Sequence, residues 1–257
     1  MDGEDSTPRV ALVTGGGIRV GQAIVRALVG AGWRVWIHHH RSIEPAQSLA
    51  RELDPDAVLG LVAGDLSVAA ERTRVCAHLL DDVGPAGGRL DLLVNNAASF
   101  ERGEFLARQD RDLERVLATN LVAPVSLMRS FAPALLHSAG SIVNIVDVAG
   151  FHPLRDYLDH CVAKAGLEMA TRALAVELAP IRVNAVAPGT VAWPTDAHHG
   201  EDSPARAAVV KQIPLGRIGT PQDVARAVLY LADAPFVTGS CLRVDGGRIA
   251  AMGGSRA

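Results

Sequence analysis

The chain has 257 residues, a formal net charge of −3 and a hydrophobic fraction of 49%. These values suit one α/β domain with a large buried core, and they exclude the strong positive charge that draws proteins to nucleic acid or to anionic membranes. The three cysteines form no CxxC pair, which indicates a reduced, cytoplasmic chain. The polar start is unlike a signal peptide, and no apolar run reaches the length of a membrane span.

Apolar runs alternate with helical patterns along the whole chain. In chain order, the patterns predict strand 10–13, helix 20–29, strand 33–37, helix 45–53, strand 57–63, helix 69–83, strand 90–94, helix 110–138, strand 141–146, helix 156–178, strand 181–186, helix 221–231 and strand 240–244. The strands are apolar throughout, which is typical of a parallel sheet covered by helices on both faces. The sequence therefore predicts a single doubly wound, Rossmann-type α/β domain with a mostly parallel sheet over residues 9–248, between a tail at 1–8 and another at 249–257.

The first predicted strand ends in a glycine-rich turn, Thr14-Gly15-Gly16-Gly17-Ile18-Arg19-Val20-Gly21. Glycines let the backbone approach a pyrophosphate closely, and the helix that follows offers free N–H groups and the positive end of its dipole. The turn therefore predicts a dinucleotide site formed by Gly15, Gly17, Arg19, Val20 and Gly21. The spacing differs from the usual GxGxxG, so a plain strand-to-helix turn is the alternative.

The second predicted strand ends in basic and hydroxylated residues, His40, Arg41 and Ser42. Sheets that select NAD carry an acid here, which holds the ribose hydroxyls. An arginine binds a 2′-phosphate through two N–H groups and a serine adds a hydrogen bond, so we predict NADPH as the cofactor. A solvated basic strand end is one alternative, and a metal site on His38 and His40 is another. We expect no metal, because no acid or cysteine completes a ligand set nearby.

Further short motifs occur after the glycine turn. In chain order they are Asp65-Leu66, Asn95-Asn96-Ala97-Ala98, Asn120, Pro188-Gly189 and Asp245-Gly246-Gly247. With the glycine turn, this order resembles the short-chain dehydrogenase/reductase family over roughly residues 9–248. The resemblance implies a homotetramer, and it implies further cofactor contacts from residues at the strand ends and on the long helix 156–178. These residues are Asp65, Leu66, Asn96, Ala97, Lys164, Pro188 and Gly189.

Other features resemble the pteridine reductases within that family. Arg19 lies in the glycine turn, Ser99-Phe100 follows the Asn-Asn-Ala motif, and Asp147 stands where most of the family has serine. The resemblance implies that these residues line a pterin site together with Tyr157, and that Phe100 stacks on the flat substrate. It also implies a dihydropteridine as the small-molecule partner, of the dihydrobiopterin, dihydromonapterin or dihydrofolate type.

The chain departs from the family in the catalytic helix, where the family carries Tyr-x-x-x-Lys. Lys164 is in place, but His160 occupies the tyrosine position. The two residues are four apart and share a helix face. The resemblance implies catalytic roles for Asn120, Asp147, His160 and Lys164. Either His160 acts as the acid, or Tyr157 supplies a hydroxyl from about one helical turn away, or the chain has lost turnover and still binds NADPH.

The reaction class bears on this choice. Reduction of a carbonyl forms an alkoxide, which needs a strong, positioned proton donor, whereas the nitrogen left by reduction of a C=N bond is protonated more easily. We therefore favour an imine reductase over a binding protein without turnover, and a reductase of another carbonyl or imine is the remaining alternative. The stretch 190–210 shows no clear period and resembles a lid, in which Trp193 either stacks on the substrate or anchors the loop.

Overall fold

A parallel β-sheet forms the centre of the protein. The computed structural model describes residues 8–82, 89–192 and 204–252. The sheet has seven strands in the order β3-β2-β1-β4-β5-β6-β7, and every neighbouring pair is parallel. The strands are β1 Val10–Val13, β2 Arg34–His39, β3 Val58–Ala63, β4 Leu92–Asn95, β5 Ser141–Ile145, β6 Arg182–Pro188 and β7 Cys241–Val244. This is the doubly wound α/β fold that the sequence predicts.

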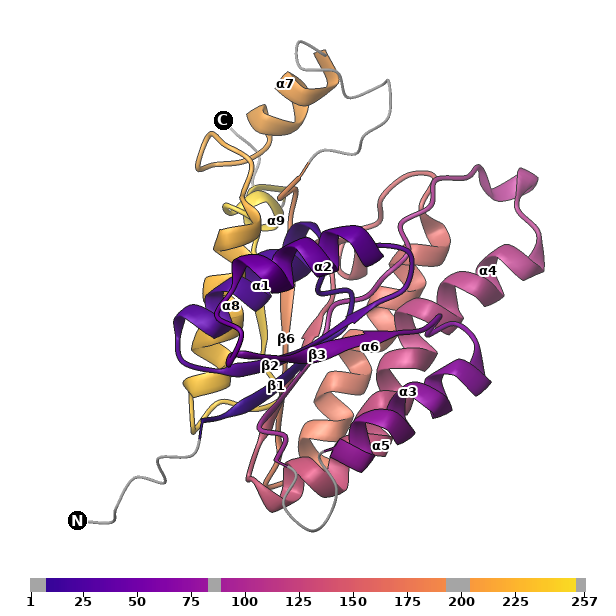
Figure 1. The fold of residues 1–257 in the computed structure, drawn as a ribbon. Coiled ribbons are helices and arrows are strands. Elements are labelled where there is room, and N and C mark those ends of the chain that lie inside the picture. The colour runs from indigo at the N-terminus through magenta and orange to yellow at the C-terminus, as the bar shows by residue number, and fades with distance from the viewer. Residues whose placement is uncertain (1–7, 83–88, 193–203, 253–257) are drawn as a thin grey trace.

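Helices cover both faces of the sheet (Figure 1). They are α1 Arg19–Gly30, α2 Ile43–Glu52, α3 Ala69–Asp82, α4 Asp110–Leu117, α5 Ala123–His137, α6 Leu158–Glu177, α7 Pro204–Lys211, α8 Pro221–Asp233 and α9 Arg248–Met252. Helices α1, α2 and α8 pack on one face, and α3, α5 and α6 pack on the other. In the part of the chain that the structure describes, no helix combines the length and the apolar character needed to cross a membrane.

Two apolar cores lie on the two faces of the sheet, and β1 shows why its sequence suits that position. Successive side chains of a strand point to opposite faces. Val10 and Leu12 accordingly belong to the core under α3, α5 and α6, whereas Ala11 and Val13 belong to the core under α1, α2 and α8. All four side chains are buried. A strand with no polar face is therefore what a central position in this sheet requires.

The order in which strands are added to the sheet reverses beside β1, and this reversal positions the site. From β1 the chain builds outward through β2 and β3, and it then returns to the other side of β1 to form β4. The loops that follow β1 and β4 therefore diverge and leave a crevice at the carboxyl ends of these strands. The glycine turn follows β1 and the Asn95–Ala98 motif follows β4, so the two motifs meet at this crevice.

Three segments differ from the sequence prediction. The predicted helix 110–138 is divided into α4, a π-helical turn Ala118–Val122 and α5. Within the stretch 190–210, which shows no period, the structure places α7. The predicted tail 249–257 begins inside α9, whose start is fixed because the Asp245 carboxylate accepts a hydrogen bond from the Ile249 backbone N–H at 2.9 Å.

Candidate active site

The turn between β1 and α1 excludes side chains at two of its glycines. Gly15 has a φ of +61°, and a Cβ on this residue would lie 3.1 Å from the Cα of Ala97. A Cβ on Gly21 would lie 2.1 Å from the carbonyl oxygen of Gly15, which is far inside van der Waals contact. Arg19, at the start of α1, also has a positive φ of 51°. The tightly curled backbone fits the pyrophosphate of a dinucleotide, which needs close backbone approach at a helix N-terminus.

The loop after β4 holds this turn in place. The Thr14 hydroxyl oxygen accepts hydrogen bonds from the backbone N–H groups of Asn96 and Ala97, at 2.9 and 3.0 Å. The Asn96 side-chain amide donates in return to the carbonyl oxygens of Thr14 and Gly15, at 2.9 and 3.1 Å. The two loops that border the crevice are therefore fixed to each other, and the Asn-Asn-Ala motif shapes the turn from the opposite side.

His38 joins the glycine turn to the end of β3. Its Nδ1 accepts a hydrogen bond from the Gly15 backbone N–H at 3.2 Å, and its Nε2 donates to the Gly64 carbonyl oxygen at 3.0 Å. Burial lowers the pKa of His38 to about 4, so the ring is neutral at physiological pH, as these two bonds require. Both ring nitrogens are thus occupied by the fold. Among the described residues, no three His, Cys, Asp or Glu side chains are grouped to hold a metal.

Charged and hydroxylated side chains meet where β2 and β3 end. His40 and Arg41 are exposed and Ser42 is half-buried. His40 Nε2 lies 3.8 Å from one carboxylate oxygen of Asp65, and the other oxygen accepts hydrogen bonds from the backbone N–H and the hydroxyl of Ser67. Burial alone would raise the pKa of Asp65, but these hydrogen bonds and the charges of His40 and Arg41 lower it. The end of β2 therefore presents a guanidinium, an imidazole and a hydroxyl group, a set that fits a phosphate.

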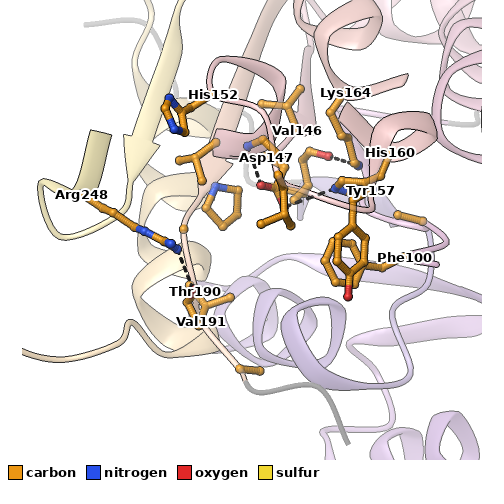
Figure 2. A pocket seen from close by; sticks show the side chains of 18 of the residues that line it. Phe100, Val146, Asp147, His152, Tyr157, His160, Lys164, Thr190, Val191 and Arg248 are labelled. Carbon is orange, nitrogen blue, oxygen red and sulfur yellow. Dashed lines mark hydrogen bonds and ion pairs between the residues drawn. The ribbon is translucent and has the colours of Figure 1, made fainter. Parts of the chain in front are cut away.

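A cavity of about 710 Å³ opens beyond the carboxyl ends of β5 and β6 (Figure 2). One wall is aromatic. The Phe100 ring stacks on the Tyr157 ring, with centroids 4.3 Å apart and planes 18° apart. The His160 ring meets Phe100 edge-on, with centroids 4.8 Å apart. The cavity volume is within the range of small-molecule sites, and its wall offers aromatic surface next to ionisable groups.

Asp147 and His160 form a pair at the same wall. His160 Nε2 lies 3.4 Å from one carboxylate oxygen of Asp147, and the other oxygen accepts a hydrogen bond from the Ala149 backbone N–H at 2.8 Å. The His160 side chain is 4% exposed, whereas that of Asp147 is 29% exposed. The carboxylate is therefore the member of the pair that a molecule in the cavity reaches first.

The other ring nitrogen of His160 has a partner for each protonation state. Nδ1 lies 3.3 Å from the side-chain nitrogen of Asn120 and 3.3 Å from the carbonyl oxygen of Ser99. A neutral ring that carries its proton on Nε2 accepts from Asn120, and an imidazolium donates to Ser99. Asn120 is oriented by two bonds of 2.8 Å to the backbone of Ser99. Nδ1 therefore has a hydrogen-bond partner whether or not it carries a proton.

Lys164 lies one turn along α6 from His160 and is buried. Its Nζ donates a hydrogen bond to the carbonyl oxygen of Ile145 at 2.7 Å. Burial lowers the pKa of Lys164 to about 8, and the negative charge of Asp147 offsets part of that effect. A buried lysine with a lowered pKa beside a carboxylate in a cavity is a typical feature of catalytic sites.

Ion pairs attach the loop that carries the aromatic wall to the start of α6. Arg108 pairs with the buried carboxylate of Asp159, with Nε 2.8 Å from the carboxylate oxygen. Arg102 pairs with Asp156 at 2.8 Å. Both acids flank Tyr157 in the sequence. The two pairs therefore fix the position of the aromatic wall relative to the helix that carries the histidine and the lysine.

Comparison with known proteins identifies the family. Residues 17–248 match a family model described as enoyl-(acyl carrier protein) reductase. The chain is 37% identical to carbonyl reductase family member 4 of Danio rerio, in an alignment that covers 93% of this chain and 97% of that protein. It is 36% identical to a Streptomyces violaceoruber protein named as a ketoacyl reductase of the granaticin polyketide synthase, with 93% and 95% covered. It is 33% identical to pteridine reductase 1 of Leishmania tarentolae, with 94% and 96% covered. The chain belongs to the short-chain dehydrogenase/reductase family.

Membership in the short-chain dehydrogenase/reductase family makes this protein an oxidoreductase of a family that uses nicotinamide cofactors. The glycine turn and the polar end of β2 fit such a cofactor, as described above. The structure brings ten of the predicted site residues to the wall of this cavity: Arg19, Val20, Asn96, Phe100, Asp147, Tyr157, His160, Lys164, Pro188 and Gly189.

Other predicted residues lie elsewhere. Ser99 and Asn120 stand behind the cavity wall and hold His160. The Leu66 side chain is packed in the apolar core, so only its backbone faces the strand ends. Trp193 lies outside the described residues.

The sequence analysis missed the residues that close the side of the cavity opposite Phe100. Helix α9 contributes Arg248, Ile249 and Met252 to the lining, and Figure 2 shows Arg248 on the side away from Phe100. Gly246 and Gly247 have φ values of +63° and +85°, and they turn the chain back from β7. The Asp-Gly-Gly motif was therefore the signal for a reversal that brings the C-terminal helix to the site.

Proposed function

We propose that the protein is an NADPH-dependent reductase that transfers a hydride to a C=N bond of a dihydropteridine. The convergence of Arg19, Phe100, Asp147 and Tyr157 on one cavity carries this proposal. Phe100 offers an aromatic face to a flat ring, and Asp147 offers a carboxylate to ring N–H groups. These are the residues through which the sequence resembles the pteridine reductases, and a pteridine reductase is among the relatives.

The chain's own side chains would deliver the proton that this reduction needs. NADPH, when bound, supplies the hydride. Asp147 is exposed to the cavity and in contact with His160, so a proton of the imidazolium would pass along this contact to a ring nitrogen of the substrate. The ring that remains is neutral and keeps its proton on Nδ1, which donates to the Ser99 carbonyl oxygen. Lys164 would hold the nicotinamide ribose and keep a positive charge beside the carboxylate.

The same proposal includes a preference for NADPH over NADH. Arg41 and Ser42 follow β2 at the position where an acid would hold the ribose hydroxyls of NADH. Asp65 is the acid of the neighbouring strand end, but its carboxylate is engaged by Ser67 and lies near His40. The groups at this end are therefore the Arg41 guanidinium, the His40 imidazole and the Ser42 hydroxyl, which suit the 2′-phosphate.

Reduction of a carbonyl is the second candidate, because relatives named as carbonyl and ketoacyl reductases are at least as similar to this chain. The site supports it less. An alkoxide needs a donor aimed at the reacting oxygen, whereas His160 is buried and reaches the cavity beside Asp147.

The deciding experiment is NADPH oxidation by the purified protein with dihydrobiopterin, with dihydrofolate and with a β-ketoacyl thioester. Wild type should turn over the pteridines, and Asp147→Ala should lose most of that activity. Turnover of the thioester alone would replace the proposal with carbonyl reduction. Tight NADPH binding without turnover, in wild type and in His160→Tyr alike, would indicate a binding protein. Activity in His160→Tyr alone would show an intact site that has lost its proton donor.

We also propose a homotetramer built partly on α6. Val162, Met169 and Val176 are seven residues apart and 47%, 58% and 81% exposed, so they form an apolar stripe on the outer face of this helix. Light scattering during gel filtration should give four chains for wild type and fewer for Met169→Glu. A monomeric wild type would contradict the proposal.

A further inference from the structure

The described lining residues that α9 contributes to the cavity are Arg248, Ile249 and Met252, which carry one positive charge and no carboxylate. Within the described lining of the cavity, Arg19, Lys164 and Arg248 are cationic, and Asp147 supplies the single carboxylate. Figure 2 shows Arg248 reaching in from the side away from Phe100, with Asp147 between them. The anion that would balance Arg248 is therefore not provided by the cavity wall.

Arg248 is held by uncharged groups. Its two terminal nitrogens donate to the Thr190 hydroxyl at 3.3 Å and to the Gln212 amide oxygen at 2.8 Å. Its Nε is buried and has no hydrogen-bond partner among the described residues. Arg108, another arginine with little exposure, is instead paired with a carboxylate. These neutral partners leave the guanidinium of Arg248 without an ion-pair partner among the described residues, and a bound anion would supply one.

The turn before α9 fixes the direction of Arg248. The Asp245 carboxylate accepts hydrogen bonds from the backbone N–H groups of Gly247 and Ile249, both at 2.9 Å. These bonds anchor the first turn of α9, and they also occupy the neighbouring carboxylate. The guanidinium is thus presented to the cavity from a fixed backbone and is available to a ligand.

We propose that Arg248 binds a carboxylate on the side chain of the substrate and so selects pteridines with an acidic side chain over those with a neutral one. This inference rests on the proposed function. The ring would lie beside Phe100 and Asp147, and the side chain would extend across the cavity. Arginine matches a carboxylate with two parallel hydrogen bonds, which makes it a selective partner for this group. Pteridines of the folate type carry such carboxylates, and those of the biopterin type do not.

The test is the binding of folate and of biopterin to the protein saturated with NADP⁺, measured by calorimetry so that no turnover is needed. Arg248→Gln should weaken folate binding about tenfold and change biopterin and NADPH binding less than about twofold. Arg226→Gln is the matched control, because it removes the same charge from an 80% exposed side chain on α8. This control should leave both pterins unaffected.

Three outcomes would overturn the inference or separate it from the proposed function. An equal loss for folate and biopterin would make Arg248 a structural residue. A loss of NADPH affinity would assign its charge to the cofactor. If neither pterin binds wild type, the proposed function fails. The Arg248 subsite is then tested with 4-aminobenzoylglutamate, which carries the carboxylates of folate without the pterin ring. A rise in the melting temperature of wild type but not of Arg248→Gln would support the subsite. No rise in either protein would reject it.

Discussion

Replacement of Lys164 by methionine should stabilise the protein at neutral pH and abolish its activity. Burial lowers the pKa of this lysine from 10.5 to about 8, so the fold disfavours the charged side chain by about 3 kcal/mol at pH 7. The hydrogen bond from Nζ to the Ile145 carbonyl oxygen offsets about 1 kcal/mol of this cost. Methionine has a similar length and no charge. We therefore expect the variant to be more stable by about 2 kcal/mol.

The pH dependence of this stability difference distinguishes a buried charge from a simple packing effect. Below pH 8 the lysine is protonated in the folded and the unfolded chain, and the full cost is present. Between pH 8 and 10.5 the unfolded chain binds the proton more tightly, so wild type gains stability relative to the variant as pH rises. Urea unfolding of both proteins at about pH 7 and about pH 10 measures the difference. A difference that stays constant between these two pH values would refute the reasoning.

Three further substitutions test other parts of the site. Arg41→Ala should raise the KM for NADPH about tenfold and leave that for NADH unchanged, and equal losses would remove the 2′-phosphate assignment. Gly21→Ala should abolish cofactor binding in a fluorescence titration, because its Cβ would lie 2.1 Å from the Gly15 carbonyl oxygen, and normal binding would show that the turn relaxes. Arg108→Leu should cost about 3 kcal/mol in urea unfolding, because it leaves the buried carboxylate of Asp159 unpaired, and a change within error would mean that the pair adds no stability.

The sheet could be predicted from the sequence because its strands are buried on both faces. β1 has no polar residue, and alternate side chains of this strand enter different cores. Hydrophobic patterns record burial of this kind directly. They do not record how a helix is hydrogen-bonded, so the segment 110–138 reads as one helix although Ala118–Val122 forms a π-helical turn. That turn contains Asn120, which lies directly behind the histidine of the site.

The half of the site at the strand ends could also be predicted, because parallel strands bring their carboxyl ends to one edge. The residues after β1, β4 and β5 meet there as a consequence of the topology. The opposite half depends on contacts between distant segments. Arg248 reaches Thr190 and Gln212 only because the double-glycine turn reverses the chain, and Arg108 meets Asp159 across 51 positions. Neither contact leaves a periodic pattern in the sequence.

We propose that His160, which the resemblance places at the family tyrosine position, changes which side chain meets the substrate. The His160 ring is almost fully enclosed by Phe100, Asn120 and Asp147. Asp147 is the more exposed member of the pair, so a proton leaving the ring reaches the cavity at a carboxylate and not at a phenol. A carboxyl group placed in this way serves a ring nitrogen, which accepts a proton readily, better than it serves an oxygen that must be stabilised as an alkoxide. This arrangement around His160 is the physical basis on which we propose a C=N bond as the group that is reduced.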